Sequence, residues 1–139
     1  MFLYELKEER KNYFLKLCYY AISTDGIIND DEIDVMKEYS NELSIEPVLS
    51  CPEETVEEVL YKLSESSEKE RRIVLAEIVA LLKVDKEYNE KEREFSKSVA
   101  NHLNYNENEL EEFEADVDAF LDSFKRLCSL INDGKKEEI

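Results

Sequence analysis

The chain has 139 residues, of which 35 are acidic and 18 are basic, so its formal net charge at pH 7 is −17. A negative charge of this size repels the phosphates of nucleic acids and of anionic membranes, which argues against direct nucleic-acid binding. No apolar run approaches about 20 residues, so no membrane insertion is expected. Two glycines, two prolines and 42% hydrophobic residues indicate one folded domain, residues 1–139, built almost entirely of helices.

Three helices are predicted in the first half of the chain, each with apolar side chains at helical spacing. Asp25-Gly26 ends the first, because glycine accepts the left-handed backbone that terminates many helices. Asn29, followed three residues later by Glu32, is a capping-box pattern that begins the second. Two prolines mark the next loop, with Pro52 in the first turn of the third helix. The predicted ranges are 2–23, 30–43 and 52–64.

Three more helices are predicted in the second half. Ser67 with Glu70 caps the fourth helix, which is apolar almost all round and is therefore expected in the centre of the core. Its β-branched residues raise a strand as an alternative, but its length and alanines favour a helix. Asn106 with Glu109 caps the sixth helix, whose long apolar seam is expected to end at Gly134. The predicted ranges are 68–84, 90–103 and 107–132, followed by a frayed tail, 133–139.

The two halves share a register of 60 residues. Asp25, Asn29 and Glu32 recur as Asp85, Asn89 and Glu92, and apolar positions on both sides recur with them. This register predicts an all-α, six-helix, orthogonal or bundle-like domain made of two pseudo-repeated three-helix units, residues 1–64 and 65–132. The first and fourth helices should pack together at its centre, because neither unit can bury its apolar face alone.

The stretch from Ala21 to Glu32, with Asp25-Gly26-Ile27-Ile28 and then Glu32, resembles the motif of the tellurite-resistance TerB-like family. The resemblance covers about residues 15–105 and implies an all-helical fold with an internal repeat. It also implies a stress-response role and a divalent cation, Ca²⁺ or another, at the acidic junctions.

Carried over residue by residue, the resemblance implies Asp25 and Glu32 as metal ligands and, with less support, Asp85 and Glu92. The second junction departs from the motif, because Lys86 and Tyr88 replace the glycine and the second isoleucine. Lys86 and Lys91 would also repel a cation.

A structural interpretation of the same residues stands beside the metal. Asn29 and Glu32 are the residue types of a capping box, and Asp25 suits a turn that binds loop amides. Ile27 occupies a position where a calcium-binding EF-hand loop would carry an acid. Capping accounts for these residue types without a metal.

The remaining residues give no catalytic constellation. The three cysteines have neither disulfide nor zinc-site spacing, which favours reduced thiols in a cytoplasmic protein. Cys18 and Cys128 lie on apolar stripes and are expected in the core, whereas Cys51 lies in a loop and is expected to be exposed. His102 is the single histidine and has no adjacent nucleophile. We therefore predict no enzyme and no certain cofactor.

Acidic side chains crowd the first turns of the sixth helix. Beyond the first turn, such acids gain little from the helix dipole, so they suit a solvated face or a docking surface. They are Glu107, Glu111, Glu112, Glu114, Asp116 and Asp118. The function predicted is a non-enzymatic binding or stress-response module that docks a protein partner with a basic patch. An acidic mimic of nucleic acid that inhibits a DNA- or RNA-binding protein is the alternative, and an enzyme ranks third.

Overall fold

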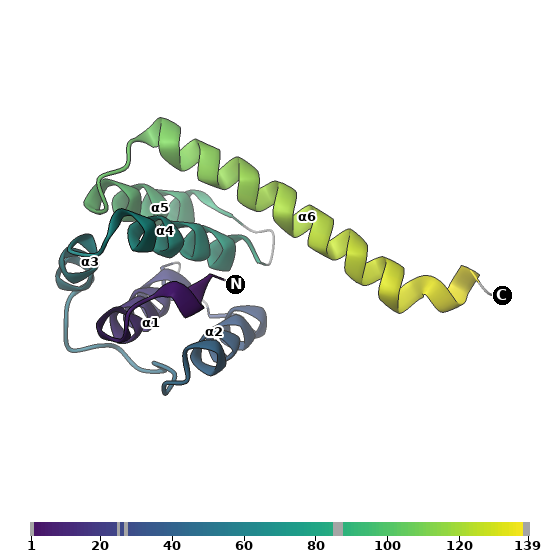
Figure 1. Cartoon of the computed structure of the whole chain (residues 1–139), viewed down its shortest axis with the longest axis horizontal. Helices are drawn as coiled ribbons and strands as arrows, with labels where there is room; N and C mark the ends of the chain where they lie inside the picture. Colours follow the sequence, from purple (N-terminus) through teal and green to yellow (C-terminus); the bar gives the residue numbers. More distant parts are fainter. Residues whose placement is uncertain (1, 25, 27, 85–87, 138–139) are drawn as a thin grey trace.

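The computed structural model describes residues 2–24, 26, 28–84 and 88–137. Every regular element in this part of the chain is a helix, so the all-α prediction is confirmed (Figure 1). The elements are the short 3₁₀ helix η1 (Leu3–Glu5) and the α-helices α1 (Glu8–Ile22), α2 (Asp30–Leu43), α3 (Val56–Ser64), α4 (Glu68–Lys83), α5 (Glu90–His102) and α6 (Glu107–Glu137).

Capping boxes begin five of the helices. In each box a polar cap accepts the backbone N–H three residues ahead, and the Glu at that position accepts the N–H of the cap. The boxes predicted at α2, α4 and α6 are confirmed, and the structure adds two, at α3 and α5. The pairs are Asn29/Glu32, Thr55/Glu58, Ser67/Glu70, Asn89/Glu92 and Asn106/Glu109.

The third helix begins later than predicted. Pro52 was expected in its first turn, but α3 starts at Val56, because the Thr55 side chain and Glu58 close a capping box there. A capping box supplies acceptors for two backbone N–H groups at the start of a helix. A proline in the first turn only lacks an N–H group that would otherwise have no partner there.

The first helix was predicted as one element over residues 2–23, and the structure divides it. η1 and α1 are separated at Leu6 and Lys7, which have extended backbones. Leu3 and Leu6 are buried, so this end of the chain is packed rather than loose. The division has a tertiary cause, because two carboxylates of α4 hold this segment: Glu70 accepts the backbone N–H of Lys7 in the break, and Glu77 accepts that of Phe2 before η1.

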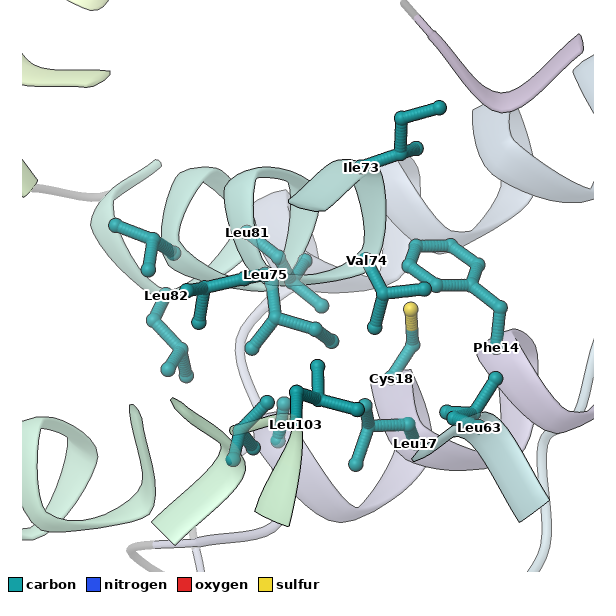
Figure 2. Packing of buried hydrophobic residues seen from close by; sticks show 14 of the residues in the cluster. Phe14, Leu17, Cys18, Leu63, Ile73, Val74, Leu75, Leu81, Leu82 and Leu103 are labelled. Atoms are coloured by element: carbon teal, nitrogen blue, oxygen red, sulfur yellow. The ribbon is translucent and has the colours of Figure 1, made fainter. Parts of the chain in front are cut away.

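The core lies around α1 and α4, which contact each other as expected. α1 also contacts α2 and α3, and α4 also contacts α2, α5 and α6. Figure 2 shows Phe14 and Cys18 of α1 facing Val74 and Leu75 of α4. All four are fully buried, and burying a large apolar side chain contributes about 1.5–3 kcal/mol.

α6 extends beyond the rest of the molecule. It has 31 residues, which corresponds to a rod of about 46 Å at 1.5 Å per residue. Its first turns lie against α4 and α5, where Leu110 and Val117 are buried, and its later turns project into solvent (Figure 1). The predicted seam is therefore inside the fold over its first part and exposed over its second.

The predicted end of this helix at residue 132 is wrong, because α6 runs through Gly134 to Glu137. A glycine inside an exposed helix costs only about 1 kcal/mol relative to alanine. Among the described residues, no element packs beside the projecting turns that would force the chain to turn at this point. Residues 133–137, predicted as a frayed tail, are helical.

Several elements recur at a fixed spacing. α4 begins at Glu68, 60 residues after Glu8 of α1, and α5 begins at Glu90, 60 residues after Asp30 of α2. The two non-glycine residues with left-handed backbone in the described chain, Ser44 and Asn104, are also 60 apart. α3 and α6 differ, with 9 and 31 residues. In the described residues, no helix is both long and apolar enough to cross a membrane.

Candidate functional site

The first junction joins α1 to α2. Ser23 and Thr24 end α1 by donating their hydroxyls to the carbonyl oxygens of Tyr19 and Tyr20, at 2.8 and 3.0 Å. Gly26 then adopts a φ of +79°, a left-handed backbone that a side chain would strain, with no atom near the position of a Cβ. The predicted glycine stop therefore has a local backbone cause.

Glu32 is fixed by the cap of α2. Its Oε1 accepts the backbone N–H of Asn29 at 3.2 Å, and Asn29 Oδ1 accepts the backbone N–H of Glu32 at 2.8 Å. The side chain is buried, with 3% of its surface exposed. Glu92 and Asn89 repeat this arrangement at 3.1 and 2.9 Å, and Glu92 is equally buried. Both predicted glutamate ligands therefore have a structural role in a helix cap.

The predicted metal ligands are divided between described and undescribed positions. Asp25 and Asp85 lie outside the described residues. Among the residues that are described, no group of three or more His, Cys, Asp or Glu side chains is placed to hold a metal ion. Glu32 and Glu92 thus do not form a donor set with other described side chains, and the assignment of a divalent cation stays a prediction.

Tyr88 gives the second junction a different role from the first. Its hydroxyl donates a hydrogen bond to Glu114 Oε2 in α6, and Arg93 Nε donates to the same oxygen at 3.3 Å. Lys83 Nζ lies 4.5 Å from the centre of the Tyr88 ring and forms an ion pair with Asp118 at 2.8 Å. These contacts hold Tyr88, the start of α5 and the end of α4 against α6.

The protonation states of Tyr88 and Arg93 favour a stable attachment of α6, and we call Tyr88, Arg93 and Glu114 the anchor. Burial and then the hydrogen bond to Glu114 raise the pKa of the Tyr88 hydroxyl far above its usual range. The hydrogen bond to Glu114 also raises the pKa of the Arg93 guanidinium. The phenol and guanidinium therefore stay protonated and keep their bonds to the buried carboxylate. This cluster explains where α6 is held and where its projecting part begins.

α4 carries two buried acids, of which the sequence identified Glu70 only as a capping residue and did not indicate Glu77. Glu70 Oε2 accepts the backbone N–H of Lys7 at 3.1 Å, and Glu77 Oε1 accepts that of Phe2 at 3.2 Å. Both side chains are buried in α4. A glutamate inside an otherwise apolar helix, as at Glu77, was the available signal. Their role is structural, because they satisfy the backbone of the N-terminal segment.

Half of the six acids predicted on the face of α6 form ion pairs within the fold. Glu114 is buried beside Tyr88 and Arg93, Glu107 pairs with Arg93 and Lys97, and Asp118 pairs with Lys83. Glu107 and Asp118 remain exposed although they are paired, and the other three predicted acids, Glu111, Glu112 and Asp116, are exposed as well. Sequence reasoning thus placed on one surface several acids that in fact hold α6 to the domain.

A more continuous acidic surface lies on α2 and was not singled out from the sequence. Asp30, Asp34, Glu38 and Glu42 follow one another at intervals of four residues, and all are exposed. We name these four residues the α2 ridge. Within the described part of the chain, Asp30, Asp34 and Glu38 form no ion pair. The available signal was the spacing of four, which places side chains on one helix face.

Comparison with protein-family models, with curated proteins and with solved structures finds no match for this chain.

The thiols and the histidine offer no second site. Cys18 is fully buried as predicted, and burial, followed by the charge of Glu77, raises its pKa well above the usual value. Cys51 is exposed as predicted, whereas Cys128 is half-buried on α6 and not in the core. Its turn of α6 lies beyond the domain, which corrects the prediction. His102 Nδ1 lies 2.8 Å from the carbonyl oxygen of Ser98 in its own helix.

Proposed function

We propose that this chain is a non-enzymatic interaction module of the TerB-like type that docks a protein with a basic patch. The α2 ridge is the observation that carries the proposal. α2 contains six acids and one base, and the ridge presents four of the acids at successive turns of one exposed face. Such a face suits a row of Lys or Arg side chains.

The physical cost of the ridge supports a binding role. Like charges four residues apart on a helix repel each other by about 0.2–0.5 kcal/mol per pair. Only Asp30 lies in the first turn, where the helix dipole offsets part of this cost. A cationic partner would remove the repulsion, so complex formation gains from charges that oppose helix formation in the free protein.

The TerB-like part of the proposal rests on the motif around Asp25 and on the repeated unit. The 60-residue spacing of the helix starts, of the capping boxes at Asn29 and Asn89, and of the left-handed Ser44 and Asn104 supports a duplication. We infer that α1–α2 and α4–α5 are equivalent pairs. α3 and α6 are the members of the two units that have diverged most in length.

Affinity capture with matched variants tests the docking surface. The ridge variant Asp34→Asn/Glu38→Gln removes two charges from α2, and Glu111→Gln/Glu112→Gln removes two exposed charges from α6 as a control. A partner bound by the ridge should be captured from the native cell by wild type and control and released by added salt. Its capture by the ridge variant should be reduced. Equal capture by both variants would contradict the role of α2.

The alternative function is mimicry of nucleic acid by the acidic surface. The exposed acids lie on several helices, including α1, α2, α3, α5 and α6, and this distribution favours a protein-docking surface over a single row of phosphate-like charges. Competition separates the two. Duplex DNA or RNA should displace the captured partner if mimicry is correct, and it should leave the partner bound if the partner recognises the α2 ridge.

A link to a divalent cation is the part of the proposal that depends on the resemblance alone. Calorimetric titration of Ca²⁺ into wild type and into Asp25→Asn/Glu32→Gln tests it. The Gln at position 32 retains an acceptor for the capping box, so the variant should fold. Heat in wild type that is lost in the variant, with a Ca²⁺-dependent rise in melting temperature, would support the link; neither effect in wild type would remove it.

A further inference from the structure

The projecting part of α6 carries an apolar seam that the domain does not cover. The seam consists of Phe120, Phe124, Leu127 and Ile131, and all four side chains are exposed. We name these four residues the outer seam. The rings of Phe120 and Phe124 stack on each other, with centroids 6.1 Å apart, so the seam begins with a continuous aromatic surface. This surface is separate from the α2 ridge and does not depend on the docking function proposed for it.

The spacing of the outer seam selects another helix as its partner. Its members follow Leu110, Phe113 and Val117 in alternating steps of three and four residues. This is the heptad pattern in which one helix packs along a second one. Leu110, Phe113 and Val117, which precede the outer seam, lie in the part of α6 that contacts α4 and α5, and Leu110 and Val117 are buried there. The outer seam continues the same pattern without a helix beside it.

Charge favours a second copy of the chain over a basic partner here. Residues 107–118 contain seven acids and no base, whereas residues 119–133 contain two acids, Asp122 and Asp133, and two bases, Lys125 and Arg126. The positions that flank the seam, Leu121, Ser123, Cys128 and Leu130, are uncharged. Two copies of this strongly acidic chain can therefore approach along this segment without like-charge repulsion at the contact.

The apolar area that the outer seam exposes is large enough for an interface. The outer-seam side chains are 41%, 55%, 54% and 72% exposed in chain order, and the adjacent Leu130 is 66% exposed. At about 150–200 Å² for each fully exposed large side chain, these five residues present roughly 500 Å² of contiguous apolar surface. The largest apolar patch of a typical monomer covers about 300–600 Å² and is often functional, so a seam of this size suits an interaction site. Two such seams with their polar edges approach the roughly 1,200–2,000 Å² of a specific interface.

We propose that the outer seam is a homodimer interface, in which the projecting parts of two α6 helices pair as a short two-stranded coiled coil. The same patch is used by both copies, which is the arrangement of a two-fold dimer. Dimerisation would bury Phe124 and Leu127 at the centre of the contact, and the outer seam includes no residue of α2.

Sedimentation equilibrium of the full chain tests the proposal at concentrations up to about 10⁻⁴ M, where an interface of this modest size associates. Wild type should be a dimer. Phe124→Ser/Leu127→Ser should raise the dissociation constant by about 100-fold or more, because it removes the centre of the apolar contact. Both side chains are exposed, so the circular-dichroism melt of the variant domain should stay cooperative.

The control variant is Leu49→Ser/Tyr61→Ser, which removes two exposed apolar side chains outside α6 and should leave the dimer intact. A wild type that stays monomeric over the whole concentration range would overturn the proposal. If this monomer bound phosphatidylcholine vesicles through the outer seam, the seam would be a lipid-binding surface and not a dimer interface. A dimer that persists in Phe124→Ser/Leu127→Ser would also overturn it, since the interface would then lie elsewhere.

Discussion

Glu70 joins two segments with one carboxylate, and its removal is a sharp test of the structure. Oε1 accepts the N–H of Ser67 at 3.1 Å and closes the capping box of α4. Oε2 accepts the N–H of Lys7 at 3.1 Å and fixes the break between η1 and α1. Glu70→Ala leaves both amides without this acceptor. At about 1 kcal/mol or somewhat more per lost bond, we expect a loss of about 2–3 kcal/mol in the free energy of unfolding.

A matched control isolates the tertiary part of this effect. Glu58 closes the capping box of α3 by accepting one N–H, that of Thr55, and it is exposed. Glu58→Ala should therefore cost only about 0.5–1 kcal/mol, the usual range for an exposed cap. Urea unfolding of wild type and both variants measures the difference. Equal costs for the two variants would show that the bond from Lys7 to Glu70 contributes nothing.

The pH dependence of the free energy of unfolding, measured for wild type and Glu70→Ala, tests the role of the Glu70 charge independently. Burial raises the pKa of Glu70, but bonds from the amides of Lys7 and Ser67 and from the Ser67 hydroxyl outweigh it, so the pKa lies below its ordinary value. A carboxyl whose pKa is lowered by folding stabilises the fold above the unfolded-state pKa of about 4.3, and this contribution disappears as the pH falls through the folded-state value. The gap in stability between wild type and Glu70→Ala should therefore narrow from pH 7 to acid pH. A gap that is unchanged over this range would refute the charge contribution.

Three further outcomes are expected from other positions. Under native conditions Cys51 should react rapidly with a thiol reagent and Cys18 should not, because Cys18 is buried with a raised pKa; its rapid labelling would contradict the packing of α1 on α4. Gly26→Ala should lower the free energy of unfolding by about 1 kcal/mol, owing to the left-handed backbone and not to a clash, and a neutral effect would contradict the φ of +79°. Tyr88→Phe should cost about 1–2 kcal/mol because it removes a hydrogen-bond donor from buried Glu114, and a urea midpoint equal to that of wild type would refute the anchor.

Local features of this chain were predictable because neighbouring residues in the sequence produce them. A cap such as Asn29, Ser67 or Asn106 needs only a polar side chain and a Glu three residues later, so the starts of α2, α4 and α6 followed from short patterns. The same holds for the glycine stop at Gly26 and for the apolar face of α4. Thr55 with Glu58 was equally local, and it was overlooked because Pro52 gave a competing start signal.

The candidate sites depended on contacts that the sequence does not contain. Periodicity identifies an apolar seam but does not say how far a neighbouring element extends along it, so the exposure of the outer seam could not be predicted from the sequence. Likewise, the row of acids on α6 gave no indication that Lys83 and Arg93 would reach Asp118 and Glu114 from other helices.

The sequence by itself determined the helical class, most helix boundaries and the 60-residue register, because backbone capping and the burial of one helix face act over a few residues. The tertiary structure decided three other features: the split of the first helix by Glu70 and Glu77, the engagement of the α6 acids, and the exposure of α6 beyond the anchor at Tyr88. The physical reason is that each of these depends on which groups from distant segments meet. That is why the exposure of the outer seam became visible only once the helices were packed.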